Sequence, residues 1–153
     1  MEYRASIVIP AYNEEKNIER VIKDLKALGR EYQIIVIDDG SRDRTLPLAR
    51  KMGAECHRLP KNMGKGYACR TGASLSKAGK IIFLDADAQF YAGDIPKIEK
   101  LLDWHDLVIG VRDFSSIPVQ RRFSNWFVRR IINLATGGNI KDALCGLRGI
   151  KRE

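Results

Sequence analysis

In Ile81-Ile82-Phe83-Leu84-Asp85-Ala86-Asp87-Ala88-Gln89, four apolar residues run directly into two carboxylates spaced two positions apart. A continuous apolar run of this length is typical of a strand buried on both faces. Side chains at i and i+2 of an extended chain point the same way, so Asp85 and Asp87 are predicted to lie side by side where the strand ends. Close carboxylates repel each other unless a cation lies between them, and hard oxygen ligands suit Mg²⁺ or Mn²⁺. The alternative is a solvated acidic turn.

Apolar runs and amphipathic segments alternate along the rest of the chain. The predicted strands cover residues 6–10, 32–37, 56–59, 81–84 and 106–111, and the predicted helices cover residues 13–28, 43–52, 67–77 and 94–102. We expect Asn13 to cap the first helix, Asp43 or Ser41 to cap the second, and Trp104 to lie in the core. Short loops between alternating strands and helices predict an α/β fold, a Rossmann-like, mostly parallel sheet flanked by helices.

Polar side chains follow four of the predicted strands. They occupy residues 12–14, the pair Asp38-Asp39, residues 85–89 and Arg112. Ligands of such sheets bind beyond the carboxyl ends of the strands, so this convergence favours a nucleotide site. Asp38 and Asp39 suit hydrogen bonds from a base or a ribose, and an Asx-turn with an N-cap is the structural alternative.

The loop Asn62-Met63-Gly64-Lys65-Gly66 is expected to place backbone N–H groups and Lys65 near phosphates, unless it is only a flexible turn. It is not a P-loop, because Gly66 follows Gly64-Lys65 where that motif needs Ser or Thr. The first strand does not lead into G-x-G-x-x-G, which disfavours a dinucleotide site.

Composition restricts the class of protein. The 153 residues suffice for one domain, and the net charge of +8 favours anionic partners. Three separated cysteines indicate reduced cytosolic thiols, and His57 and His105 have no catalytic partner in sequence. No run reaches the length of a membrane span. Nucleic acid is not expected as a partner, because aromatic residues are not interleaved with the basic ones.

The segment 118–135 combines an apolar face that carries Trp126 and Phe127 with a basic face that carries Arg121, Arg122 and Arg129. Such a helix suits a membrane interface, and a core-packing helix with a charged solvent face is the alternative.

Six motifs in order resemble the family 2 glycosyltransferases, most closely the dolichyl- or polyprenyl-phosphate sugar synthases. They are Pro10-Ala11-Tyr12-Asn13-Glu14-Glu15, Val36-Ile37-Asp38-Asp39-Gly40-Ser41, Asn62-Met63-Gly64-Lys65-Gly66, Asp85-Ala86-Asp87-Ala88-Gln89, Gly110-Val111-Arg112 and Asp142-Ala143-Leu144-Cys145-Gly146-Leu147-Arg148. The resemblance implies a GT-A fold and a nucleotide-sugar donor. Family members continue beyond the point that corresponds to Glu153, so we expect a single catalytic domain over residues 1–153 that lacks the C-terminal part of the family fold.

The resemblance also implies roles for individual residues. The donor would be held by Pro10, Tyr12, Glu14, Ile37, Asp39, Lys65, Asp85 and Ala86, the metal by Asp85, Asp87 and Gln89, and the acceptor phosphate by Arg112, Arg121, Arg122 and Ser124. Asp87 and Arg112 are the expected catalytic residues. Two positions depart from the family pattern, since Asn125 and Cys145 stand where the family more often has Ser.

The resulting hypothesis is a metal-dependent inverting transfer of a sugar from GDP-mannose or a UDP-hexose to a polyprenyl or dolichyl phosphate. An ionised phosphate needs no general base, whereas a hydroxyl acceptor does, and Asp113 and Asp142 are the candidates for one. The rivals are a hydroxyl-acceptor glycosyltransferase and a non-catalytic nucleotide-binding module. A nucleotidyltransferase would carry a Gly- and Arg-rich loop where residues 11–14 stand. We expect the protein to be cytoplasmic and peripheral at the cytoplasmic face of the membrane.

Overall fold

The computed structural model describes residues 3–29, 31–111, 130, 134, 142 and 145–152. The strands are β1 (Ala5–Ala11), β2 (Tyr32–Asp38), β3 (Glu55–Arg58), β4 (Lys80–Phe83), β5 (Leu107–Ile109) and β6 (Arg148–Lys151). The helices are α1 (Ile18–Lys26), α2 (Thr45–Lys51), α3 (Lys65–Ser74) and α4 (Ile95–Leu101), with the 3₁₀ turn η1 (Ala92–Asp94) before α4.

The strands form one sheet in the order β3-β2-β1-β4-β6-β5. Strands β3, β2, β1 and β4 are parallel neighbours, and β6 runs antiparallel between β4 and β5. The predicted α/β class and mostly parallel sheet are therefore confirmed. Strand β6 was not predicted, because Arg-Gly-Ile-Lys has neither an apolar run nor an apolar alternation.

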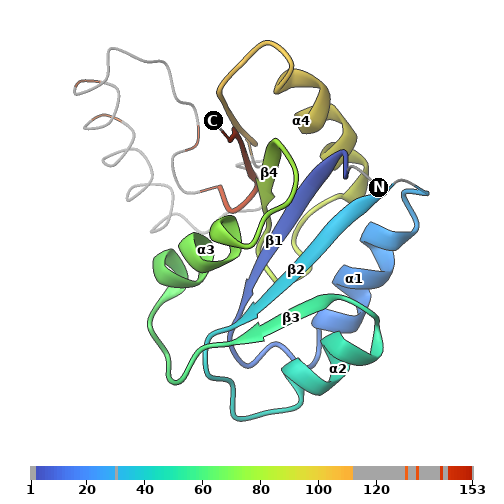
Figure 1. The fold of residues 1–153 in the computed structure, drawn as a ribbon, viewed down its shortest axis with the longest axis vertical. Coiled ribbons are helices and arrows are strands. Elements are labelled where there is room, and N and C mark those ends of the chain that lie inside the picture. The colour runs from blue at the N-terminus through green and yellow to red at the C-terminus, as the bar shows by residue number, and fades with distance from the viewer. Residues whose placement is uncertain are drawn as a thin grey trace.

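Helices cover both faces of the sheet (Figure 1), which explains why the central strands are mostly apolar on both faces. Alternate residues of β1 enter opposite cores. Ile7 and Ile9 belong to the cluster that contains the buried side chains of α1 and α4, together with Ala49 of α2. Val8 belongs to a second cluster, with Ala68 of α3. Helix α1 contributes Ile18, Val21, Ile22 and Leu25, the expected helical spacing.

Three local expectations are corrected. Helix α1 begins at Ile18, and Asn13 is not its cap, because the Asn13 Oδ1 accepts the N–H of Arg42 (2.9 Å). Helix α3 begins at Lys65, inside the predicted loop. Trp104 is 81% exposed and not in the core, because Ile95, Ile98 and Leu102 already fill the core-facing positions of α4 and its end.

Most of the predicted amphipathic segment 118–135 lies outside the described residues, as does Arg112. Within that segment Arg130 and Leu134 are described, and both are helical and exposed. No helix among the described residues is long and apolar enough to cross a membrane.

Candidate active site

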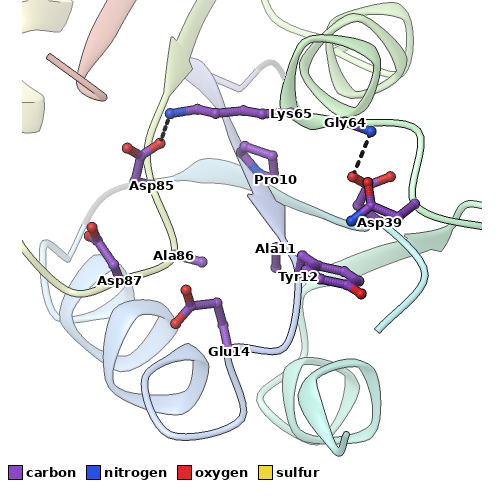
Figure 2. A pocket seen from close by; sticks show the side chains of 11 residues that line it. Pro10, Ala11, Tyr12, Glu14, Asp39, Gly64, Lys65, Asp85, Ala86 and Asp87 are labelled. Atoms are coloured by element: carbon purple, nitrogen blue, oxygen red, sulfur yellow. Dashed lines mark hydrogen bonds and ion pairs between the residues drawn. The ribbon is translucent and has the colours of Figure 1, made fainter. Parts of the chain in front are cut away.

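A pocket of about 300 Å³ opens where β1, β2 and β4 end and α3 begins (Figure 2). It is lined by Pro10, Ala11, Tyr12, Glu14, Asp39, Asn62, Gly64, Lys65, Asp85, Ala86 and Asp87. Parallel strands deliver their carboxyl ends to one edge of the sheet, so segments far apart in the sequence meet there. In Figure 2 the acidic side chains of Asp85, Asp87 and Glu14 follow one wall, and Tyr12 and Asp39 lie on the other.

The pocket gathers most of the donor and metal residues that the sequence singled out. Ile37 is the exception among the donor residues, because it does not line the pocket and its side chain is fully buried in the core beside α3. Gln89 is exposed and does not line the pocket. Arg112, Arg121, Arg122 and Ser124 lie outside the described residues, so their acceptor roles stay predictions. Asn62 and Gly64 of the predicted phosphate loop also line the pocket, and Ala11 lines it without having been predicted as a ligand contact.

Asp39 fastens the glycine-rich loop to the end of β2. Its carboxylate oxygens accept the N–H groups of Met63 (2.7 Å) and Gly64 (2.9 Å). Gly40 follows with a φ of 77°, and a Cβ there would lie 2.8 Å from the carbonyl carbon of Lys61. The loop therefore packs directly on the strand-end turn. Each carboxylate oxygen has a second lone pair, so Asp39 still has acceptor capacity toward the pocket.

Asp38 has a different role from its neighbour. Its side chain is fully buried, and Oδ1 accepts the N–H of Ser41 (3.0 Å). Oδ2 makes no hydrogen bond and lies 3.4 Å from the Nε of Arg58, which gives an ion pair without hydrogen-bond geometry. For Asp38 the structural alternative, a strand-end turn, is the one that the fold adopts.

The turns that follow β1 and β2 are joined by backbone-to-side-chain hydrogen bonds. The N–H of Asn13 donates to the Ser41 hydroxyl (2.9 Å), that of Glu14 to the Thr45 hydroxyl (2.7 Å), and that of Glu15 to Asp43 (3.0 Å). These bonds hold the backbone next to Tyr12 and Glu14 in place. Asp43 also accepts the N–H of Thr45, the first residue of α2 (3.0 Å). The N-cap position itself is occupied by Arg44, without a side-chain capping hydrogen bond, and not by Asp43 or Ser41 as expected.

The pKa of Asp43 reflects these contacts. Burial on its own would raise it, but the hydrogen bonds from the Thr45 hydroxyl and from the N–H groups of Thr45 and Glu15 together lower it. Asp43 is therefore held as a carboxylate.

Asp85 and Asp87 leave the end of β4 with the small, buried Ala86 between them. The Nζ of Lys65 forms an ion pair with Asp85 Oδ1, and Asp87 Oδ1 accepts the N–H of Gln89 (3.0 Å). Ala88 bends the chain there with a φ of 58°, an uncommon value for a residue other than glycine. The two carboxylates thus reach the pocket from one short segment, as the i, i+2 spacing predicts.

These donors fit a divalent ion such as Mg²⁺ or Mn²⁺. Both are hard carboxylate oxygens, both are partly solvent-accessible, and Lys65 shows that a cation is accommodated against Asp85. Among the described residues, no third His, Cys, Asp or Glu joins them in a metal-binding group. Further ligands would come from substrate phosphates and water, the arrangement typical of Mg²⁺ at phosphate-transfer sites.

The histidines and Cys69, which the sequence left without a catalytic role, do not line this pocket. His57 and His105 are exposed. Cys69 is half-buried, and burial raises the pKa of its thiol, which disfavours the nucleophilic thiolate.

Residues 6–153 match the family model described as Glycosyl transferase family 2. The chain belongs to this family. The family 2 glycosyltransferase is 38% identical over 164 aligned positions to an uncharacterized protein of Methanocaldococcus jannaschii, with 95% of this chain and 71% of that protein covered. It is 33% identical to the undecaprenyl-phosphate 4-deoxy-4-formamido-L-arabinose transferase of Pseudomonas paraeruginosa, with 96% of this chain and 47% of that enzyme covered. The chain thus spans about half the length of this second relative.

Solved structures agree with this family assignment. Glucosyl-3-phosphoglycerate synthase from Mycobacterium tuberculosis, crystallised with phosphoglyceric acid, superposes with a TM-score of 0.78 at 25% identity over 96% of this chain and 56% of that chain. The same enzyme crystallised with Mn²⁺ and UDP-glucose gives a TM-score of 0.79 at 25% identity over 96% of this chain and 55% of that chain. These matches confirm the expected GT-A fold for this family 2 glycosyltransferase.

Proposed function

We propose that this family 2 glycosyltransferase moves a sugar from a nucleotide sugar, GDP-mannose or a UDP-hexose, to a polyprenyl or dolichyl phosphate, with inversion and with Mg²⁺ or Mn²⁺. The observation that carries the proposal is the placement of Asp85, Asp87 and Lys65 around one pocket at the ends of the parallel strands. A diphosphate needs cations, and this pocket offers a lysine and a pair of carboxylates suited to a metal ion.

The two walls of the pocket would contact different parts of the donor. Tyr12 and Asp39 would contact the nucleoside, and Lys65 would donate to a donor phosphate. The metal, bound by Asp85 and Asp87, would supply positive charge to the leaving nucleoside diphosphate. These carboxylates also fix where the diphosphate lies, so the sugar is oriented for attack by the acceptor from the opposite face.

The choice of acceptor rests on the need for a base. A lipid phosphate arrives ionised and requires only positioning by cationic side chains, a role proposed for Arg112, Arg121 and Arg122. Asp142, one of two candidate bases for a hydroxyl acceptor, is fully buried, which makes it a poor proton acceptor for a substrate in an open pocket. The Pseudomonas relative is an undecaprenyl-phosphate sugar transferase by name, which favours the same acceptor class. Such a substrate would bring the protein to the cytoplasmic face of the membrane.

The test combines donor binding with transfer. We expect titration calorimetry to detect binding of a nucleotide sugar that strengthens with Mn²⁺, and labelled donor to be transferred to polyprenyl phosphate but not to soluble sugars. Asp87→Ala should abolish both the metal effect and transfer. Asp94→Ala is the matched control, because Asp94 pairs with Lys97 on the surface, 2.8 Å away, and does not line the pocket. Full metal-dependent turnover by Asp87→Ala would refute this site assignment.

A further inference from the structure

The side chain of Asp85 lies against Gly146, a glycine in the segment that leads into β6. In the antiparallel pair of β4 and β6, Phe83 lies opposite Arg148. Asp85 and Gly146 each lie two residues beyond this last pair, outside the two strands, and they remain in close contact there.

The space at Gly146 is occupied by the Asp85 carboxylate. A Cβ at position 146 would overlap the carboxyl carbon and Oδ2 of Asp85 and would lie 2.9 Å from Oδ1. Gly146 is not among the glycines with a positive φ, so a left-handed backbone is not the reason for a glycine here. The requirement for glycine is therefore steric, and its cause is a single side chain.

The backbone on either side of Gly146 is held in place. The Nε of Arg148 donates to the Cys145 carbonyl (2.8 Å), and the N–H of Gly110 donates to the Leu147 carbonyl (2.9 Å). A methyl group at position 146 would therefore be attached to a main chain that is held by hydrogen bonds, and it would overlap the Asp85 side chain, which can rotate about two torsions. The carboxylate of Asp85 would turn away, and it would leave its ion pair with Lys65.

We propose that Gly146 is a positioning residue for Asp85: the missing side chain at 146 leaves the space in which the carboxylate faces Lys65 and the pocket. The expected effect of Gly146 on metal and donor binding rests on the proposed function. The steric pairing itself is independent of that function, so the two are separable by experiment.

The first experiment is a double-mutant cycle on thermal unfolding without metal or nucleotide. Gly146→Ala should lower Tm by about 3 °C when Asp85 is present, as expected for a modest strain in a domain of this size. In the Asp85→Ala background the same substitution should leave Tm unchanged, because the overlapping atoms are gone. Should the single variant fail to fold, recovery of folding in the double variant supports the proposal equally. An equal loss in both backgrounds, or no loss in either, overturns it.

Gly149→Ala, three residues further along the chain and within β6, is the matched control. A Cβ at 149 would meet Ile98 and Leu102 of the core, at 2.6 and 2.8 Å, and not Asp85. Its effect on Tm should be the same whether residue 85 is Asp or Ala.

The second experiment measures the strengthening of UDP binding by Mn²⁺, by calorimetry. We expect Gly146→Ala to reduce this strengthening about tenfold and Gly149→Ala to preserve it at a temperature where both are folded. Unchanged strengthening in Gly146→Ala overturns the positioning role even if the thermal cycle shows coupling. Absence of any Mn²⁺ effect in the wild type contradicts the proposed function, and the thermal cycle then decides the pairing of Gly146 with Asp85.

Discussion

Lys65 is predicted to weaken binding of the metal ion alone and to strengthen binding of the nucleotide-sugar donor. Its ammonium group is already paired with Asp85. A Lys⁺ about 5 Å from a divalent ion repels it by about 1.7 kcal/mol in a water-like dielectric, so Lys65→Gln should tighten Mn²⁺ binding by a factor of about 15 in the absence of nucleotide. The same substitution removes a charge-assisted hydrogen bond to a donor phosphate, worth about 1.5–3 kcal/mol, and should weaken nucleotide-sugar binding by about 10- to 100-fold.

The effect on stability should be small. The side chains of Lys65 and Asp85 are 58% and 36% exposed, and exposed ion pairs contribute only about 0–1 kcal/mol. Lys77→Gln is the matched control, because Lys77 pairs with Glu55 at 3.4 Å with nearly the same exposures, 63% and 37%, outside the pocket. It should alter neither affinity.

Mn²⁺ affinity is measured by the paramagnetic resonance signal of free Mn²⁺ and donor affinity by calorimetry, both at low salt because these charges are screened by ions. If Lys65→Gln left Mn²⁺ affinity unchanged, or moved both affinities in the same direction, the assignment of Lys65 to the shared Asp85 site would be wrong.

Three further predictions concern stability, each read from thermal unfolding. Asp39→Asn should cost about 2 kcal/mol, because an amide cannot accept both N–H groups of the glycine-rich loop, and a Tm equal to that of the wild type would argue against this fastening. The pKa of Asp43 is lowered in the folded state, so its contribution is present above the unfolded value of about 3.9 and is lost as pH falls through the folded pKa. The difference in Tm between the wild type and Asp43→Ala should therefore shrink between pH 6 and pH 3, and a constant difference would contradict the shift. Gly72→Ala should cost about 1–3 kcal/mol, since its Cβ would overlap Val8 of β1, whereas Gly66→Ala in the same helix meets nothing within 4 Å and should be neutral or stabilising.

The parallel half of the sheet was predictable from local pattern. Its central strands β1 and β2 are mostly apolar on both faces, because helices cover both sides, and such runs stand out in a sequence. Strand β6 gave no such signal, since its sequence Arg-Gly-Ile-Lys is polar at two of four positions. Its place between β4 and β5 depends on pairing with strands that lie far away in the chain.

The candidate site shows the same division. The i, i+2 spacing after an apolar strand was enough to predict that Asp85 and Asp87 reach one pocket. The motif resemblance also named Ile37 as a donor residue, but its side chain is buried in the core. At the end of a strand, a residue that faces the core is followed directly by one that faces the pocket, and a sequence motif that covers both does not show which is which. Gly146 belonged to a motif without an assigned role, and its relation to Asp85 appears only when β6 is placed beside β4.

By itself the sequence determined the α/β class, the family and the chemical type of the site, since these follow from apolar runs and from short motifs at strand ends, which are local properties of the chain. Tertiary structure alone decided which groups contact the carboxylates of the site. Lys65 pairs with Asp85, the N–H groups of the glycine-rich loop donate to Asp39, and Gly146 leaves space for the Asp85 side chain. The physical reason is that these contacts join residues from 20 to about 60 positions apart, and their partners are fixed by strand order and packing, which no local pattern encodes.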